Sequence, residues 1–173
     1  MTATTATTTA TTDLTIIKQR APMAAVRLAL TPAGSAPGLL DGAWWPRSRD
    51  LLRELPSLAA ELDPIWGRIT HATVNPTYWP VIPHKVPAAG HTVHVGWFAA
   101  EQDPHQVTLH SYTEGRWDLL VVPPETDPAT AARLMAAASA PGGVRSPTRL
   151  MADGGAGDIP RPGPEALTAA SGR

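Results

Sequence analysis

The sequence predicts an α+β domain. We expect an antiparallel or mixed, strongly bent sheet of about five strands covered by two helices, with a disordered segment at each end. The strand-like segments do not alternate regularly with helical ones, so a doubly wound parallel sheet is not expected. The large apolar residues concentrate in the middle of the chain, where all six tryptophans fall between Trp44 and Trp117. A middle of this length can bury one core.

The two ends of the chain differ in composition from its middle. Residues 1–22 are rich in threonine and alanine, and residues 141–173 are rich in glycine, proline and alanine. Neither segment carries enough large apolar side chains to offset the entropy of ordering, so both are expected to be disordered. Residues 23–140 then form the single folded domain. In the first segment, residues 14–17 are a candidate for an added edge strand.

Alternation of apolar side chains with a period of two predicts the strands. The segments at residues 107–112 and 117–122 flank a short polar turn and predict a β-hairpin. The second arm of that hairpin is continuously apolar over residues 119–122. It is therefore expected to be a central strand covered on both faces. The expected strands are residues 26–30, 68–74, 91–98, 107–112 and 117–122.

Two helices are expected from helical spacing. Leucines recur every three or four positions over residues 51–62, which predicts one buried stripe. Pro56 interrupts the stripe, and an interior proline costs about 3 kcal/mol. We therefore expect a kink or a division at Pro56, and an end at the Asp-Pro pair of residues 63–64. The second helix begins at the Asp-Pro pair of residues 127–128 and carries an apolar stripe over residues 131–138.

Composition and charge exclude several classes of protein. The net charge is −1 with neutral histidines, which argues against a general nucleic-acid binder, because such proteins carry a basic excess. The absence of cysteine excludes disulfides and thiolate catalysis. No stretch approaches the run of about 18 apolar residues that a transmembrane helix requires. Residues 1–12 lack the features of a targeting peptide, so we expect no membrane contact and a cytoplasmic location.

The densest group of chemically useful side chains lies at residues 41–50, just before the first expected helix. In a structural interpretation, the tryptophans anchor a loop, and Ser48 caps the helix. The two arginines then form ion pairs with Asp41, Asp50 or Glu54. In a functional interpretation, arginine forks and the positive end of the helix dipole hold a phosphate or carboxylate. The candidate ligand-binding residues are Trp44, Trp45, Arg47, Ser48, Arg49 and Asp50.

The same segment resembles the hallmark of a known family. Residues 41–51, DGAWWPRSRDL, are similar to the motif of an uncharacterised family, a domain of unknown function found mainly in high-GC Gram-positive bacteria. Residues 119–128 resemble the second block of that family. The resemblance covers roughly residues 27–138 and leaves both tails outside. It implies no activity, but it directs attention to the tryptophan–arginine cluster.

The histidines do not indicate a metal site. Six of them lie between His71 and His110. His91 and His94 are three residues apart, which places them on opposite faces of a strand. A site could still assemble across strands from His94, His110 and Asp103, but nothing in the spacing requires it. We therefore expect no metal and no cofactor.

No catalytic set stands out in the sequence. The chain has no nucleophile elbow and no glycine-rich phosphate loop, and no base lies near Ser48. Tryptophan with arginine can stack nucleic-acid bases. A chain with one phenylalanine, however, needs its tryptophans to fill the core. Trp79 is the expected exception, because it lies in a proline-rich loop.

The sequence alone names no reaction and no oligomeric state, and three functions stay open. The expected one is a non-catalytic binding or regulatory domain, whose tryptophan–arginine surface takes a small anion or a protein segment. The second is a small enzyme that holds an anionic substrate at the same place and uses His94 or His110 as acid and base. The third is an oligomerisation scaffold, which would expose a large apolar patch.

Overall fold

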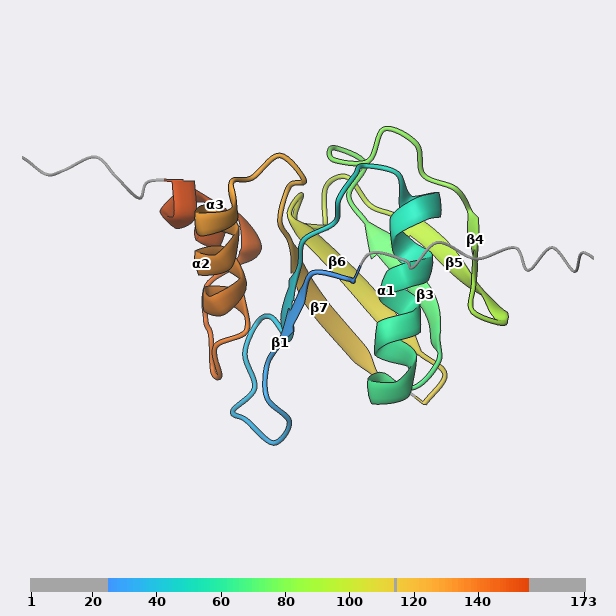
Figure 1. The fold of residues 1–173 in the computed structure, drawn as a ribbon, viewed down its shortest axis with the longest axis horizontal. Helices are drawn as coiled ribbons and strands as arrows, with labels where there is room; N and C mark the ends of the chain where they lie inside the picture. The colour runs from blue at the N-terminus through green and yellow to red at the C-terminus, as the bar shows by residue number, and fades with distance from the viewer. Residues whose placement is uncertain (1–24, 114, 156–173) are drawn as a thin grey trace, which may run out of the picture.

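The computed structural model describes residues 25–113 and 115–155, and residues 14–17 lie outside them. The expected α+β class is confirmed, with a mixed sheet that is larger than expected and with one more helix (Figure 1). The helices in this part of the chain are α1 (Leu51–Trp66), α2 (Pro128–Ala138) and α3 (Pro147–Gly155). The strands are β1 (Leu28–Leu30), β2 (Gly42–Trp44), β3 (Ile69–Val74), β4 (Lys85–Ala88), β5 (His91–Trp97), β6 (Gln106–Ser111) and β7 (Arg116–Val121).

The seven strands form one sheet in the order β1-β2-β7-β6-β3-β5-β4. β2 runs parallel to β7 and β3 runs parallel to β5, while the other neighbouring pairs are antiparallel. The expected β-hairpin is present as β6 and β7. β2 and β4 were not expected from the sequence, since each is too short to show a clear alternation.

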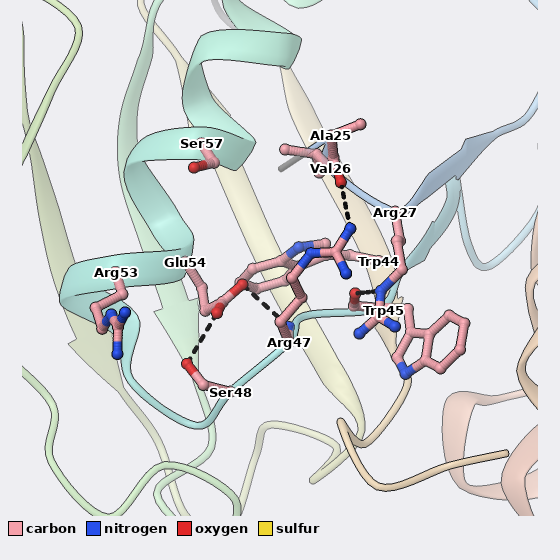
Figure 2. Close-up of a pocket in the computed structure, with 10 residues that line it drawn as sticks. All are labelled: Ala25, Val26, Arg27, Trp44, Trp45, Arg47, Ser48, Arg53, Glu54 and Ser57. Atoms are coloured by element: carbon pink, nitrogen blue, oxygen red, sulfur yellow. Dashed lines mark hydrogen bonds between the residues drawn. The ribbon is translucent and has the colours of Figure 1, made fainter. Parts of the chain in front are cut away.

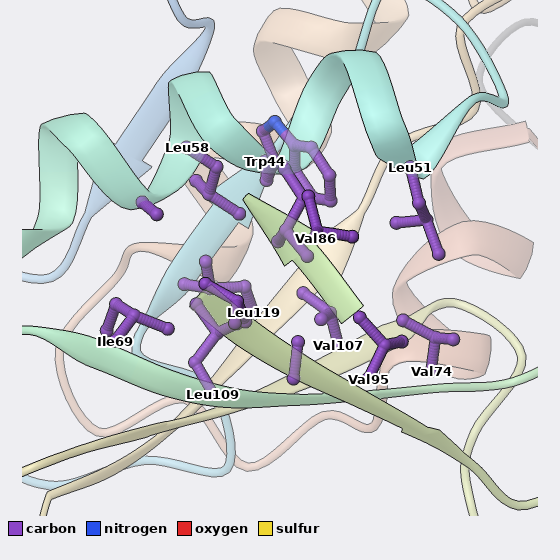
Figure 3. Close-up of a cluster of buried hydrophobic side chains, with 14 of the residues drawn as sticks. Trp44, Leu51, Leu58, Ile69, Val74, Val86, Val95, Val107, Leu109 and Leu119 are labelled. Atoms are coloured by element: carbon purple, nitrogen blue, oxygen red, sulfur yellow. The ribbon is translucent and has the colours of Figure 1, made fainter. Parts of the chain in front are cut away.

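The sheet separates two hydrophobic cores. α1 packs on one face over the larger core, which Figure 3 shows. α2 and α3 pack on the other face, at the β1–β2–β7 end. β7 contributes to both cores because successive side chains of a strand point to opposite faces. Leu119 and Val121 belong to the α1 core, whereas Leu120 and Val122 belong to the other, as expected for a central strand covered on both faces.

α1 is one helix that continues through two prolines. Asp50 caps its start, and Gly67, with a φ of 84°, caps its end. The expected division at Pro56 and the expected end at residues 63–64 are both wrong, because Pro56 and Pro64 lie inside the helix. Burying a leucine side chain contributes about 1.5–3 kcal/mol. The buried leucine stripe of α1 can therefore outweigh about 3 kcal/mol for each interior proline.

α3 lies within a segment that was expected to be disordered. Leu150 is buried against α2 in the second core. The first turn of α3 is also tied to the β5–β6 loop, because Asp103 accepts from the amide of Thr148 at 3.1 Å and from its hydroxyl at 2.9 Å. The composition hides this helix, since glycine, proline and alanine surround its one buried leucine.

Tryptophan supplies much of the core, and the expectation for Trp79 is wrong. Its ring is buried and stacks on that of Trp44, with the ring centroids 5.8 Å apart. Trp66 and Trp117 also stack, with their centroids 4.6 Å apart. The exposed tryptophan is Trp97, on β5, which keeps 44% of its surface accessible. The loop that carries Trp79 therefore closes over the α1 core.

Candidate functional site

The two segments that stand out in the sequence lie side by side in the fold. Residues 41–51 contain β2 and residues 119–128 contain the end of β7, and these two strands pair in parallel with Trp44 opposite Val121. Beyond the strands the contact continues, because the indole nitrogen of Trp45 donates to the carbonyl of Pro123 at 3.1 Å. Ligand sites in α/β sheets often lie at the carboxyl ends of parallel strands.

The glycine of the DGAWW segment is required by the packing of β1 on β2. A Cβ atom at Gly42 would lie 2.2 Å from the carbonyl oxygen of Ala29 and 2.9 Å from the Cα of Leu30. Both of these atoms belong to the backbone of β1 and cannot rotate away. A glycine here therefore lets β1 approach closely, and this approach brings the residues before β1 to the loop that follows β2.

A cavity of ≈ 400 Å³ opens between the start of β1, the β2–α1 loop and the first turns of α1 (Figure 2). We call it the arginine pocket. The guanidinium groups of Arg27 and Arg47 both reach it, next to the carboxylate of Glu54, while Arg53 points away from them at the rim. The lining residues are Ala25, Val26, Arg27, Trp44, Trp45, Arg47, Ser48, Arg53, Glu54 and Ser57.

Arg27 is held rigidly at the wall of the pocket. Its Nε donates to the carbonyl of Trp45 at 3.0 Å and its Nη2 donates to the carbonyl of Pro46 at 2.7 Å. The guanidinium also lies over the Trp45 ring, 3.5 Å from its centroid. Burial lowers the pKa of Arg27, and the charge of Arg47 lowers it further, against the opposing effect of Glu54. The positive charge of Arg47 therefore acts on Arg27.

Glu54 fastens the β2–α1 loop to the helix. One of its carboxylate oxygens accepts from the amide of Arg47 at 3.1 Å, and the other accepts from the hydroxyl of Ser48 at 2.8 Å. The Arg47 side chain then extends to the carbonyl of Ala25, at 3.0 Å. This arrangement leaves two guanidinium groups beside one carboxylate, so the interior of the pocket carries an excess of positive charge.

The amide groups at the start of α1 are occupied by Asp50. Its Oδ1 accepts from the amide of Leu52 at 3.0 Å, and its carbonyl accepts from the amides of Arg53 and Glu54 at 3.1 and 3.0 Å. An anion in the pocket would therefore contact arginine and serine side chains, and not these amides. In this respect the site differs from the helix-terminus arrangement expected from the sequence.

Arg49 points away from the pocket. Its Nη1 donates to the carbonyl of Tyr78 at 3.1 Å, its guanidinium lies 5.1 Å from the centroid of the Tyr78 ring, and it forms an ion pair with Glu125. The residues expected to bind a ligand are thus divided between two places. Those that line the arginine pocket are Trp44, Trp45, Arg47 and Ser48, and those that do not are Arg49 and Asp50.

A half-buried tyrosine–histidine pair lies next to Arg49. The hydroxyl of Tyr78 is 2.9 Å from Nε2 of His105, and Nδ1 of His105 is buried without a hydrogen-bond partner among the described residues. Burial lowers the pKa of His105, while Asp103 opposes this shift and Arg49 adds to it. The adjacent space is only ≈ 10 Å³, too small for a ligand, so we assign the pair a structural role.

Sequence reasoning missed Arg27 and Ser57, and it considered Glu54 only as an ion-pair partner of the arginines. Glu54 and Ser57 are three residues apart on α1, and a spacing of three or four brings side chains to one helix face. This spacing is a signal that could have placed both beside the motif. Arg27 carries no such signal. It lies 18 residues from Trp45 in the sequence, and only the pairing of β1 with β2 joins them.

The cross-strand set considered for a metal does not come together. His94 and His110 lie on β5 and β6 with β3 between them, while Asp103 binds Thr148 at the start of α3. Within residues 25–113 and 115–155, no three histidine, aspartate or glutamate side chains gather as metal ligands would. No helix in this part of the chain has both the length and the apolar character needed to cross a bilayer.

A family of unknown function (DUF5994) matches residues 27–138. The chain belongs to this family. The expectation of an uncharacterised family is therefore confirmed, and the DUF5994 match extends from Arg27, in the arginine pocket, to the last residue of α2. α3 follows the matched region. No match was found among curated proteins or among solved structures, so the arginine pocket itself must carry any functional argument.

Proposed function

We propose that this DUF5994 domain binds a small anionic molecule, through a phosphate or carboxylate group, in the arginine pocket, without catalysing its conversion. The observation that carries the proposal is the pair of guanidinium groups, from Arg27 and Arg47, that share one cavity with the single carboxylate of Glu54. A ligand anion would neutralise the remaining positive charge. Arginine forks match the geometry of carboxylate and phosphate oxygens.

Donor groups remain available in the pocket. A guanidinium carries five N–H groups. Bonds to described residues engage the Nε and Nη2 atoms of Arg27 and the Nη2 atom of Arg47. The hydroxyl of Ser57 adds a further donor in the wall. These groups support bidentate recognition of an anion.

The size and the wall of the pocket favour an organic anion. Small-molecule sites typically occupy about 300–1,000 Å³, and this pocket, at ≈ 400 Å³, falls within that range. A bare phosphate would fill only part of it. Trp44, Trp45 and Val26 supply apolar wall area beside the arginines. We therefore expect a ligand with a phosphate or carboxylate group joined to a small apolar or aromatic body.

The chemistry of the pocket supports binding over catalysis. No histidine is among its lining residues, and its one carboxylate, Glu54, is engaged by the amide of Arg47 and the hydroxyl of Ser48. His94 and His110 lie on strands β5 and β6, away from the pocket. An acid–base role for either histidine would therefore need a different anion site.

Calorimetric titration with phenyl phosphate, benzoate and inorganic phosphate, at low and at physiological salt, tests the proposal. We expect phenyl phosphate to bind most tightly and Arg47→Gln to weaken it by about tenfold or more, since a charge-assisted contact is lost. Arg47 is exposed, so Arg47→Gln should leave the melting temperature nearly unchanged.

Arg49→Gln is the matched control, because Arg49 lies on the same loop but faces Tyr78 and Glu125. We expect this variant to bind phenyl phosphate like the wild-type chain. Equal losses in Arg47→Gln and Arg49→Gln would indicate nonspecific attraction and would overturn the proposal. Unchanged affinity in Arg47→Gln would overturn it as well.

A further inference from the structure

One half of the sheet face opposite α1 carries a second group of basic side chains. α2 covers the β1–β2–β7 end of this face, and α3 packs on α2 (Figure 1). Over β6, β3, β5 and β4, the same face presents polar side chains, while the apolar residues of these strands point to the α1 core. The arginine pocket lies against α1, on the other side of the sheet.

The strand register brings five basic residues into one line across this face. Directly opposed residues of neighbouring strands point to the same side of a sheet. Arg116 pairs with His110, His110 with His71, His71 with His94, and His94 with Lys85. We call this line the basic row. It crosses β7, β6, β3, β5 and β4 in order.

The basic row is accessible along most of its length. Neighbouring strands lie about 4.8 Å apart, so four intervals give a length of about 19 Å. The rings of His71 and His94 stack, with centroids 5.3 Å apart and planes 26° from parallel. Arg116, His71, His94 and Lys85 are exposed, and His110 is half-buried.

The two ends of the row differ in their charge surroundings. Arg116 and Lys85 are permanently charged at its two ends, and histidine as a residue type gains a charge between about pH 8 and pH 5. At the β7 end, Arg116 forms an ion pair with Asp118 at 3.3 Å, and Asp118 also accepts from Gln106 and Thr108 at 2.7 and 2.6 Å. A second carboxylate, Asp41, lies beside them and accepts from the amide of Asp118 at 2.9 Å.

Away from Asp41 and Asp118, the other described residues near this face add little opposing charge. The next pairs across the same strands are Thr108 with Thr73 and Thr73 with Gly96, all of them uncharged. The β5–β6 loop lies against the face through Gln102, which contacts Thr108. The charged residues of that loop are Glu101, which is exposed, and Asp103, which is bound to Thr148.

The stacked rings of His71 and His94 form a favourable cross-strand contact, but positive charge along the row opposes strand pairing. Like charges directly opposite each other on neighbouring strands destabilise the pairing. Acidic side chains from a partner would remove this repulsion. The row is therefore better explained by an interaction than by folding.

We propose that the basic row docks an acidic protein segment, and that docking strengthens as the pH falls from 7.5 to 5.5. In an extended segment, side chains on one face recur about every 6.8 Å. Three alternate carboxylates therefore fit within the length of the row. Single-stranded nucleic acid, the rival polyanion, usually needs aromatic side chains on which its bases stack. The row contains no tryptophan, tyrosine or phenylalanine, and the rings of His71 and His94 already stack on each other.

Fluorescence anisotropy with a rhodamine-labelled decapeptide of alternating serine and glutamate tests the proposal at pH 7.5 and 5.5. Glutamate, with an ordinary pKa of about 4.3, stays largely ionised at both pH values. A change in affinity between them therefore reflects a change in the charge of the protein and not of the peptide. We expect about tenfold tighter binding at pH 5.5. In the triple variant His71→Gln, His94→Gln, His110→Gln, the affinity should be the same at both values.

Two single variants serve as controls. His84→Gln removes an exposed histidine that packs on Trp97 and lies outside the row, so it should keep the pH response. Arg47→Gln should bind the peptide like the wild-type chain, which separates this surface from the arginine pocket. An unchanged pH response in the triple variant would overturn the proposal. So would the absence of peptide binding, or tighter binding of a labelled ten-nucleotide oligothymidylate.

Discussion

Replacing Leu150 with alanine tests whether α3 is an integral part of the fold. Leu150 is 5% exposed and packs with Leu134 and Ala138 of α2. Leucine-to-alanine substitutions in cores cost about 2–5 kcal/mol, and the cost depends on how far the site can collapse. Leu150 borders two open grooves, so we expect the lower end, about 2 kcal/mol. Helix propensity adds no further cost, because alanine is the best helix former.

Urea denaturation followed by tryptophan fluorescence and by circular dichroism measures this loss. Both signals should report the same lower midpoint with an unchanged slope. Val144→Ala is the control, because Val144 is 83% exposed just before α3 and should change stability by less than about 0.5 kcal/mol. If Leu150→Ala is as stable as Val144→Ala, α3 does not pack on α2 as described.

Two further predictions concern the backbone contact at β2 and the effect of pH. Gly42→Ala should destabilise the domain by about 3 kcal/mol or more, since the new Cβ would lie 2.2 Å from a backbone oxygen of Ala29. A urea midpoint like that of wild type would contradict this. The pKa of His105 is lowered from its ordinary value of 6.5, so the native state binds fewer protons than the unfolded state. The stability contributed by neutral His105 is therefore complete above pH 6.5 and declines as the pH falls below it. Thermal melts between pH 5 and 8 should show a shallower decline in His105→Gln, and an equal decline would refute this assignment.

The sequence predicts those helices and strands whose own pattern of apolar residues is long enough to be recognised. The leucine stripe of α1 and the apolar run at residues 119–122 are such patterns, and both are buried as expected. β2 has three residues, too few for an alternation to be seen. β4 contains Pro87, and a proline normally argues against a strand. It is accommodated because β4 is the last strand of the sheet, where one side needs no ladder bonds.

The residues of the candidate site differ in the same way. Some are neighbours in the sequence, and others meet only through strand pairing. Trp44, Trp45, Arg47 and Ser48 are close in sequence, so a local motif could indicate them together. The position of Arg27 depends on strand pairing, and no pattern within the motif contains that information. The side chains of Arg47 and Arg49 point in opposite directions. Arg47 reaches the carbonyl of Ala25, just before β1, whereas Arg49 reaches the carboxylate of Glu125.

The parallel pairing of β2 with β7 also has a consequence for the order of folding. Trp45 and Pro123, which are hydrogen bonded, are separated by 78 positions in the chain. Closing so long a loop is entropically costly, and such contacts tend to form late. The wall of the arginine pocket is therefore expected to be completed after α1 and the β6–β7 hairpin. In a refolding experiment, recovery of phenyl phosphate binding should lag behind recovery of the helical signal.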